Sequence, residues 1–411
     1  MKVCVIGGGA AGMMCATMIA RKGHVVHLYE KNEKLGKKIY ITGKGRCNVT
    51  NATVGDEFLK NVVNGKKFVM GAITRFNSND TMKFFEDLQV PLKIERGNRV
   101  FPVSDKSSDI IKGLEKAMHW AGVEVHLNSC VQKIITQENA ITGILLDGKQ
   151  IDFDAVVVAT GGVSYPSTGS TGDGYKFAES VGHTVVSQVP SLCAVILSNP
   201  NQKLEGLSLK NVQLVSKVGD KVVYKSEIGE MLFTSNGISG PLVLSTSAFI
   251  NRIDFSKLNM FIDFKPALSI DSLLARIDRD IVALKAKQVS SLLEGFLPKS
   301  ICADFAKRLK INLTMKANQL NKENRKNLAY LLKNYELKPQ KLESFDAAVV
   351  TSGGVNLKEI NPKFMRSKLV SGLYFIGEVL DIDALTGGFN LQLAFSTAVT
   401  CASDFKDLKG A

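Results

Sequence analysis

Apolar residues at the start of the chain follow the pattern of a strand, a helix and a second strand. The run KVCVI at 2–6 is a short apolar strand, residues 10–22 are rich in small apolar side chains at helical spacing, and HVVHLYE at 24–30 is strand-like again. Together they predict a βαβ unit, which is the opening of a doubly wound α/β domain.

Further strand-like runs and one amphipathic stretch continue this α/β pattern. The stretch 106–121 places its apolar residues at the spacing of a helix with one buried face. Strands are predicted at 123–127, 130–135, 141–146 and 155–160.

The texture of the sequence changes twice after Pro190. Short alternating segments punctuated by Gly and Asn predict a small antiparallel sheet or barrel over 190–267, and charged amphipathic stretches predict a small helical subdomain over 268–340. The α/β pattern returns over 341–411. The economical arrangement is one α/β domain, made of 1–189 and 341–411, that is split by the two insertions.

Composition is that of a globular chain with two or three domains. The 411 residues include 45% hydrophobic residues, 35 Gly and 10 Pro, which allows a sizeable core and excludes intrinsic disorder. The net charge is +13; residues 1–50 hold nine basic and two acidic residues, and residues 267–340 hold fourteen basic and seven acidic. Such basic surfaces are either simply solvated or bind an acidic partner such as nucleic acid, and charge alone leaves both open.

Cysteine and histidine spacing supports neither a disulfide framework nor a metal site. The seven cysteines include no CxxC pair, and the five histidines lie in strand-like or helix-end positions without metal-ligand spacing. The uncharged run at 3–20 contains three consecutive glycines and no cleavage-like site follows it, so we expect neither a signal peptide nor a membrane span. We therefore expect a reduced, cytoplasmic protein without metal.

A dinucleotide fingerprint follows the first strand. Gly7, Gly9 and Gly12 form G-x-G-x-x-G, and Glu30 ends the second strand. The glycines permit a tight turn, close approach of a pyrophosphate and close packing of helix on strand, while Glu30 can accept hydrogen bonds from a ribose diol. An acid at this position disfavours a 2′-phosphate and favours FAD or NAD over NADP.

Three later segments favour FAD. AVVVATGG at 155–162 and GLYFIGE at 372–378 resemble strand ends that contact flavin in flavoproteins of the two-dinucleotide-binding-domain type. TGGFNLQLAFSTAV at 386–399 places a glycine pair before a long helix. The positive end of such a helix, placed beside the flavin, would stabilise its reduced anion.

Four longer stretches, at 28–51, 159–175, 229–241 and 351–398, resemble the BaiN-like (YhiN-like) flavoprotein family, with GKGRCN and GEVLD…TGGFN as the most specific signatures. The resemblance runs from residue 1 to about 400. It implies a Rossmann-like FAD-binding domain split by an inserted β-barrel-like domain and a small helical domain. Position 384 holds Ala where the family pattern has Gly.

The resemblance also implies which residues meet FAD. It assigns the pyrophosphate turn and adenosine ribose to Gly7, Gly9, Ala11, Gly12, Glu30 and Lys31. A loop close to the flavin comprises Gly43, Gly45, Arg46, Cys47 and Asn48. Val131 is placed near the adenine, and Ala159, Thr160 and Gly161 near the diphosphate. The ribityl chain and ring are assigned to Gly377, Glu378, Asp381, Gly388, Asn390 and Gln392.

Family members differ in activity, so the resemblance implies an FAD-dependent oxidoreductase with several possible substrates. The favoured one is uridine in ribosomal RNA, reduced to dihydrouridine, because the basic segments suit an RNA partner. The alternatives are a peroxide-forming oxidase of a small amine such as aminoacetone and an NAD(P)H-dependent reductase of a small unsaturated acid. No second G-x-G-x-x-G follows a strand, so NAD(P)H would visit the flavin only transiently.

Uracil reduction requires a general acid, and Cys47 is the candidate because GKGRCN lies near the ring and Arg46 could tune its thiol. The alternative is that Cys47 only packs beneath the cofactor. Lys37, Lys38 and Lys44 are candidates for contacts with FAD phosphate or RNA, with a solvated surface as the alternative.

Overall fold

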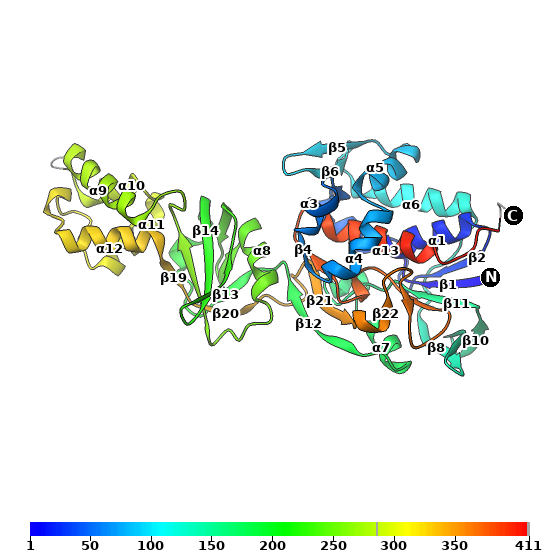
Figure 1. The fold of residues 1–411 in the computed structure, drawn as a ribbon. Coiled ribbons are helices and arrows are strands. Elements are labelled where there is room, and N and C mark those ends of the chain that lie inside the picture. The colour runs from blue at the N-terminus through cyan, green and yellow to red at the C-terminus, as the bar shows by residue number, and fades with distance from the viewer. Residues whose placement is uncertain (285–286, 409–411) are drawn as a thin grey trace. The chain divides into compact units, whose positions relative to one another are not determined.

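The computed structural model describes residues 1–284 and 287–408 and divides into two compact units (Figure 1). Unit 1 comprises Met1–Ser191 and Phe345–Ala411, and unit 2 comprises Leu192–Ser344. Each unit encloses its own cluster of buried apolar side chains.

Unit 1 is built on a seven-stranded sheet of order β22-β23-β24-β11-β1-β2-β7. The strands from β24 to β7 are parallel, and β22 and β23 are antiparallel additions. All four residues of β11 are buried, as a strand covered on both faces requires. The strand bounds are β1 Lys2–Ile6, β2 Val25–Tyr29, β7 Glu124–His126, β11 Ala155–Val158, β22 Ile360–Asn361, β23 Arg366–Ser367 and β24 Leu373–Phe375.

Helices α1, α6 and α13 lie together on one side of this sheet, and strands β8 to β10 lie on the other (Figure 1). The helix α1 is almost entirely buried, which explains why its sequence lacks a polar face. The helices of unit 1 are α1 Ala10–Arg21, α2 Lys37–Ile41, α3 Gly55–Leu59, α4 Lys66–Arg75, α5 Ser78–Asp87, α6 Ser107–Ala121, α7 Asp173–Ser180 and α13 Phe389–Ala402.

Four small sheets surround this core. One of them pairs β12 with β21 antiparallel, so the chain leaves unit 1 and re-enters it along the same two-stranded ribbon. The strands are β3 Thr50–Asn51, β4 Val62–Asn64, β5 Leu92–Glu95, β6 Arg99–Pro102, β8 Val131–Gln137, β9 Ala140–Leu146, β10 Lys149–Asp152, β12 Val185–Ser191, β21 Val350–Val355 and β25 Asp383–Ala384. Short 3-10 turns lie at Thr42–Gly45, Pro166–Thr168, Leu357–Glu359 and Gly377–Val379.

Unit 2 combines an antiparallel half-barrel sheet with five helices among its described residues. The sheet has eight strands in the order β19-β18-β14-β16-β17-β13-β20, with β15 paired to β14. Its strands are β13 Val195–Leu197, β14 Ser208–Val218, β15 Lys221–Lys225, β16 Gly229–Phe233, β17 Gly237–Ser239, β18 Leu258–Asp263, β19 Tyr335–Leu337 and β20 Pro339–Leu342. Its helices are α8 Pro241–Ile250, α9 Ile270–Leu284, α10 Val289–Glu294, α11 Lys299–Leu309 and α12 Lys322–Lys333, with 3-10 turns at Gln202–Leu204 and Ala317–Gln319.

The fold is a mixed α/β, Rossmann-like arrangement with an inserted antiparallel sheet, which confirms the coarse class predicted from sequence. Rather than a closed barrel, the inserted sheet is a half-barrel. Within the described parts of the chain, the helices are all too short or too polar to cross a membrane.

Candidate dinucleotide site

The glycine turn between β1 and α1 is packed tightly at two of its three glycines and open at the third. A Cβ on Gly7 would lie 2.6 Å from the carbonyl oxygen of Ala159, and one on Gly12 would lie 1.9 Å from that of Gly7. A Cβ on Gly9 would meet nothing within 4 Å. Gly9 is also the N-cap of α1, which has no side-chain cap. The turn therefore offers backbone N–H groups and the positive end of a helix to open space, the arrangement that binds a pyrophosphate.

Glu30 is buried beside this turn, and its carboxylate accepts three hydrogen bonds. The backbone N–H of Gly8 donates to Oε2 at 2.7 Å, and the backbone N–H and side-chain amide of Asn32 donate to Oε1 at 2.8 and 2.6 Å. These contacts fix the carboxylate at the end of β2. Asn32 was not among the residues predicted from sequence, because nothing in the motif singles it out.

A pocket opens next to Glu30. It is lined by Ile6, Gly7, Tyr29, Glu30, Lys31, Ser129, Cys130, Val131, Thr160, Asp173 and Phe177. The lining combines one acid that can accept from a ribose diol with apolar walls that suit an adenine. Five of the predicted cofactor residues thus share one pocket, although they come from segments far apart in the sequence.

Two polar side chains in the lining of this pocket differ in whether the protein itself provides their partner. Lys31 Nζ forms an ion pair with Asp173 Oδ2 at 2.6 Å, so its charge is compensated at the start of α7. Thr160 Oγ1 is buried and has no hydrogen-bond partner among the described residues. A buried hydroxyl without a partner is costly, and a bound polar ligand would satisfy it.

The end of β24 lies against the start of α1. A Cβ on Gly377 would lie 2.9 Å from the Cβ of Ala11, and the N–H of Gly377 donates to Thr397 Oγ1 at 3.0 Å. The turn at Gly377 therefore lies beside the glycine turn between β1 and α1.

Glu378 joins several segments through its carboxylate. Lys38 Nζ lies 2.7 Å from Glu378 Oε2, while Ser164 Oγ and the backbone N–H of Thr351 donate to Oε1 at 3.0 and 2.9 Å. Lys38 Nζ also donates to Ser164 Oγ at 2.6 Å. Lys38 therefore contacts a predicted cofactor residue directly, and its contacts with FAD phosphate or RNA stay predictions. A Cβ on Gly161 would lie 3.9 Å from Glu378 Oε2, so the loop after β11 borders the same cluster.

The helix α13 begins at a glycine that no other residue could replace without movement. Gly388 has a φ of +98°, and its Cβ would lie 2.3 Å from the carbonyl oxygen of Thr50. No side chain caps this helix and its first turn holds no acid. Its positive end is thus available to negative charge, as a reduced flavin would present.

Asn390 and Ala384 are joined by two hydrogen bonds. The N–H of Ala384 donates to Asn390 Oδ1 at 2.9 Å, and Asn390 Nδ2 donates to the carbonyl of Ala384 at 2.7 Å. Ala384 is not among the residues with a positive φ, so the backbone here accommodates alanine where the family pattern has glycine. Asn390 positions this turn, and any contact with the ribityl chain stays a prediction.

Gln392 and Asp381 are engaged with protein groups. Gln392 is fully buried; its oxygen accepts from Thr50 and Thr81, and its amide donates to the carbonyl of Phe76. Asp381 accepts a hydrogen bond from Asn64. The contacts of Gln392 tie α13 to β3 and α5, and the contact of Asp381 ties the preceding loop to β4. The roles of both residues toward the cofactor stay predictions.

The GKGRCN loop has an unusual backbone. Gly43, Lys44, Gly45 and Cys47 all have a φ between +57° and +84°. Arg46 forms ion pairs with Glu95 and Asp105 and lies over the ring of Phe101 at 4.2 Å. Its guanidinium is therefore used within the protein.

In this loop Cys47 is buried, and Asn48 is half-buried with a buried side-chain oxygen. Asn48 Oδ1 has no hydrogen-bond partner among the described residues, which again leaves a buried polar atom for a ligand. Cys47 is fully buried, and burial raises the pKa of its thiol to about 12. We expected Arg46 to tune this thiol, but desolvation dominates and the charge of Arg46 is directed to two carboxylates. The thiol stays protonated at neutral pH, which is the form that a proton donor needs.

The residues present fit an FAD molecule. The open position at Gly9 leaves room for the pyrophosphate, and the unpartnered atoms of Thr160 and Asn48 lie in two segments that the sequence assigned to the cofactor. Sequence reasoning missed Asn32, Asp173 and Thr351, which hold the predicted residues in place. Asn32 lies two residues from its partner Glu30, whereas Asp173 and Thr351 lie 142 and 27 residues from theirs, and the glycine motif singles out none of the three.

Comparison with known proteins extends over nearly the whole chain. Residues 1–404 match the sequence profile described as the HI0933-like protein Rossmann domain. The 3-dehydro-bile acid delta(4,6)-reductase of Clostridium scindens is 29% identical over 401 residues, which cover 96% of this chain and 97% of that protein. The ribosomal RNA dihydrouridine synthase of Haemophilus influenzae is 30% identical over 404 residues, with 97% and 96% covered.

A solved structure shares the fold. The 3-ketosteroid-delta4-(5alpha)-dehydrogenase from Rhodococcus jostii RHA1 aligns with a TM-score of 0.52 at 14% identity, over 97% of this chain and 96% of that one. At this identity the similarity concerns the fold alone.

Proposed function

The chain belongs to the HI0933-like family of FAD-dependent oxidoreductases, and on that basis we propose that it reduces a carbon–carbon double bond, with uridine in ribosomal RNA as its substrate. The observation that carries the proposal is the similarity, over 97% of the chain, to a ribosomal RNA dihydrouridine synthase. The Clostridium scindens relative, named as a delta(4,6)-reductase, supports the same reaction class.

Some of the predicted residues have a defined part in this proposed reaction. Gly7, Gly9 and Gly12 would hold the pyrophosphate, Glu30 would orient the adenosine ribose, and the positive end of α13 would stabilise negative charge on the reduced ring. FAD, when bound and reduced, would supply the hydride needed at C6 of the uracil. The proton for C5 comes from a general acid, and the protonated thiol of Cys47 is the candidate. One hydride and one proton together saturate the bond.

A transient nicotinamide donor, NADPH or NADH, is the electron source we propose. We assign the uncapped start of α13 and the pocket beside Glu30 to FAD. The sequence holds one dinucleotide fingerprint, so it offers no second motif for a nicotinamide cofactor. The donor therefore has to exchange with the substrate at the flavin.

Helix α12 of unit 2 supports an RNA substrate. Lys322, Lys326 and Tyr330 are exposed and stand four residues apart, which places them on one face of the helix. Tyr330 is 60% exposed. Cations that neutralise phosphates beside an aromatic ring that can stack on a base are the features of a single-stranded RNA surface.

The test compares this face with a matched pair of lysines in unit 1. Lys322→Gln with Lys326→Gln should weaken binding of ribosomal RNA fragments and lower the slope of log affinity against log salt by about 1.4, because each phosphate contact to a single strand contributes about 0.7. Lys83→Gln with Lys112→Gln removes the same charge from exposed positions on α5 and α6 and should change neither quantity. Arg308 is left intact because it binds Asp304 and lies over Tyr335 at 3.9 Å.

Mass spectrometry of ribosomal RNA from cells with and without the gene decides the substrate. We expect one dihydrouridine to disappear on deletion, and to return with the wild-type gene. Unchanged dihydrouridine would overturn the RNA proposal. Salt-insensitive turnover of a small unsaturated acid would then favour the reductase alternative, and peroxide formed from aminoacetone would favour the amine oxidase.

A further inference from the structure

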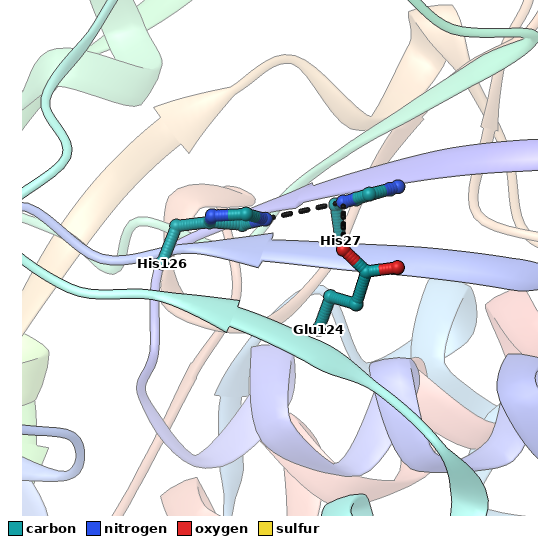
Figure 2. A group of neighbouring side chains, drawn as sticks. All are labelled: His27, Glu124 and His126. Carbon is teal, nitrogen blue, oxygen red and sulfur yellow. Dashed lines mark hydrogen bonds and ion pairs between the residues drawn. The ribbon is translucent and has the colours of Figure 1, made fainter.

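A separate cluster of metal-binding side chain types lies at the edge of the unit 1 sheet. His27 belongs to β2, and Glu124 and His126 belong to the edge strand β7 (Figure 2). The two strands are parallel, with His27 opposite Glu124 and Tyr29 opposite His126. Because side chains alternate between the faces of a strand, all three groups project from one face of the sheet.

The ligand atoms of these residues are already close together. His27 Nδ1 lies 3.1 Å from His126 Nε2 and 3.3 Å from Glu124 Oε2, and one ligand atom from each residue falls within 4.8 Å of the other two (Figure 2). A tetrahedral zinc ion, with bonds of 2.0 to 2.2 Å, places its ligand atoms about 3.4 Å apart. Small side-chain rotations would bring the three atoms onto one ion.

The surroundings hold the two imidazoles in place and leave the carboxylate accessible. The ring of His126 stacks on Tyr29, with centroids 4.6 Å apart, and the ring of His27 meets Phe153 edge-on at 5.5 Å. The side chain of Glu124 is 60% exposed. An ion here would have aromatic packing on one side and water on the other, with water completing its coordination.

We propose that His27, Glu124 and His126 form a binding site for one divalent transition-metal ion, for which zinc is the natural probe. Two imidazoles with one carboxylate suit zinc, nickel or copper, whereas magnesium and calcium prefer oxygen ligands alone. The sequence did not predict this site, because 99 residues separate His27 from His126 and only the strand register brings them together.

The position of the site gives the ion a structural consequence. It would tie the edge strand β7 to β2 through side chains, in addition to the backbone pairing. Tyr29, on which His126 stacks, also lines the pocket that contains Glu30. An ion that fixes His126 therefore fixes one wall of the adenosine pocket, and we expect zinc to slow the release of FAD.

The test is metal titration of the full-length, FAD-loaded protein after removal of metals by a chelator. Calorimetry should show one zinc ion per chain, unaffected by excess magnesium, and cobalt should give the visible absorption bands of a bound ion. Replacement of outer-shell partners already costs about 10- to 100-fold in metal affinity. Glu124→Gln and His126→Asn replace the ligands themselves and should weaken zinc binding at least tenfold.

His119→Gln is the matched control, because His119 is an exposed histidine on α6, outside the cluster. It should bind zinc like the wild type. Glu124→Gln keeps the size of an exposed side chain, so the fold persists, and circular dichroism verifies this for each variant. Absence of saturable zinc binding, or binding that survives in both Glu124→Gln and His126→Asn, would overturn the site. Neither result bears on the RNA substrate, which is tested by dihydrouridine content.

Discussion

Gly9 and Gly12 belong to the same turn but should respond differently to substitution. Gly9→Val adds a side chain where nothing lies within 4 Å, so we expect a folded protein whose added methyl groups occupy the pyrophosphate space. Gly12→Ala drives a Cβ to 1.9 Å from a carbonyl oxygen, so we expect a loss of stability of about 1–3 kcal/mol or more. Flavin absorbance and thermal melting of the two purified variants separate the effects. Full flavin content in Gly9→Val would mean that the pyrophosphate lies elsewhere.

Cys47 should make stability fall at alkaline pH. Its thiol has an ordinary pKa of 9.0 and a folded pKa of about 12, so between these values the unfolded chain releases a proton that the folded protein retains. The stabilisation is complete below about pH 9 and is lost as pH rises toward 12, with a slope of up to about 1.4 kcal/mol per pH unit. Urea unfolding of the apoprotein from pH 8 to 10.5 should therefore be less pH-dependent in Cys47→Ala. Parallel curves for the two proteins would contradict this.

The start of α13 is an element whose position depends on one glycine. Gly388→Ala combines a φ of +98° with a Cβ 2.3 Å from the carbonyl oxygen of Thr50, so we expect a loss of about 2–4 kcal/mol and weaker FAD binding. Gly71→Ala, at an exposed position inside α4 with nothing within 4 Å, should instead raise stability by about 0.5–1 kcal/mol. Chemical denaturation measures both changes in the free energy of unfolding. If Gly388→Ala and Gly71→Ala changed it equally, the steric argument at Gly388 would be wrong.

At the level of elements, the sequence predicts those helices and strands whose own residues follow a periodic apolar pattern. The strand at 2–6 is observed at Lys2–Ile6, the helix at 106–121 is observed at Ser107–Ala121, and the last helix begins at Phe389, directly after the glycine pair. These segments carry their own apolar period.

Pairings between distant segments could not be predicted in this way. Glu378 meets Lys38 across 340 residues, and β4 pairs with β25 through positions near 62 and 384. Each contact depends on how the whole chain folds, and the short elements α2 and α3 have too few residues to show a period.

The whole molecule has two separate apolar cores, and we expect each to unfold in its own transition. The residues that we assign to FAD lie in unit 1, so FAD at 100 times its Kd should raise the stability of that unit by about 2.7 kcal/mol and leave unit 2 unchanged. Phe305→Ala, which empties a fully buried position in unit 2, should lower only the other transition. Differential scanning calorimetry with and without FAD measures this. A single transition that FAD and Phe305→Ala both move would contradict it.

The insertion of unit 2 between β12 and β21 also determines the order in which the parts of a newly made chain can fold. When the ribosome has produced residues up to Ser191, the all-apolar strand β11 has β1 on one side but still lacks β24 on the other. Unit 2 is synthesised next and has the core to fold by itself, while the open edge of β11 waits for Leu373–Phe375. We expect a nascent chain halted in this interval to be prone to aggregation, because the edge of β11 is unpaired. Since α13 is made later still, we expect flavin to bind only after Phe389–Ala402 has been synthesised.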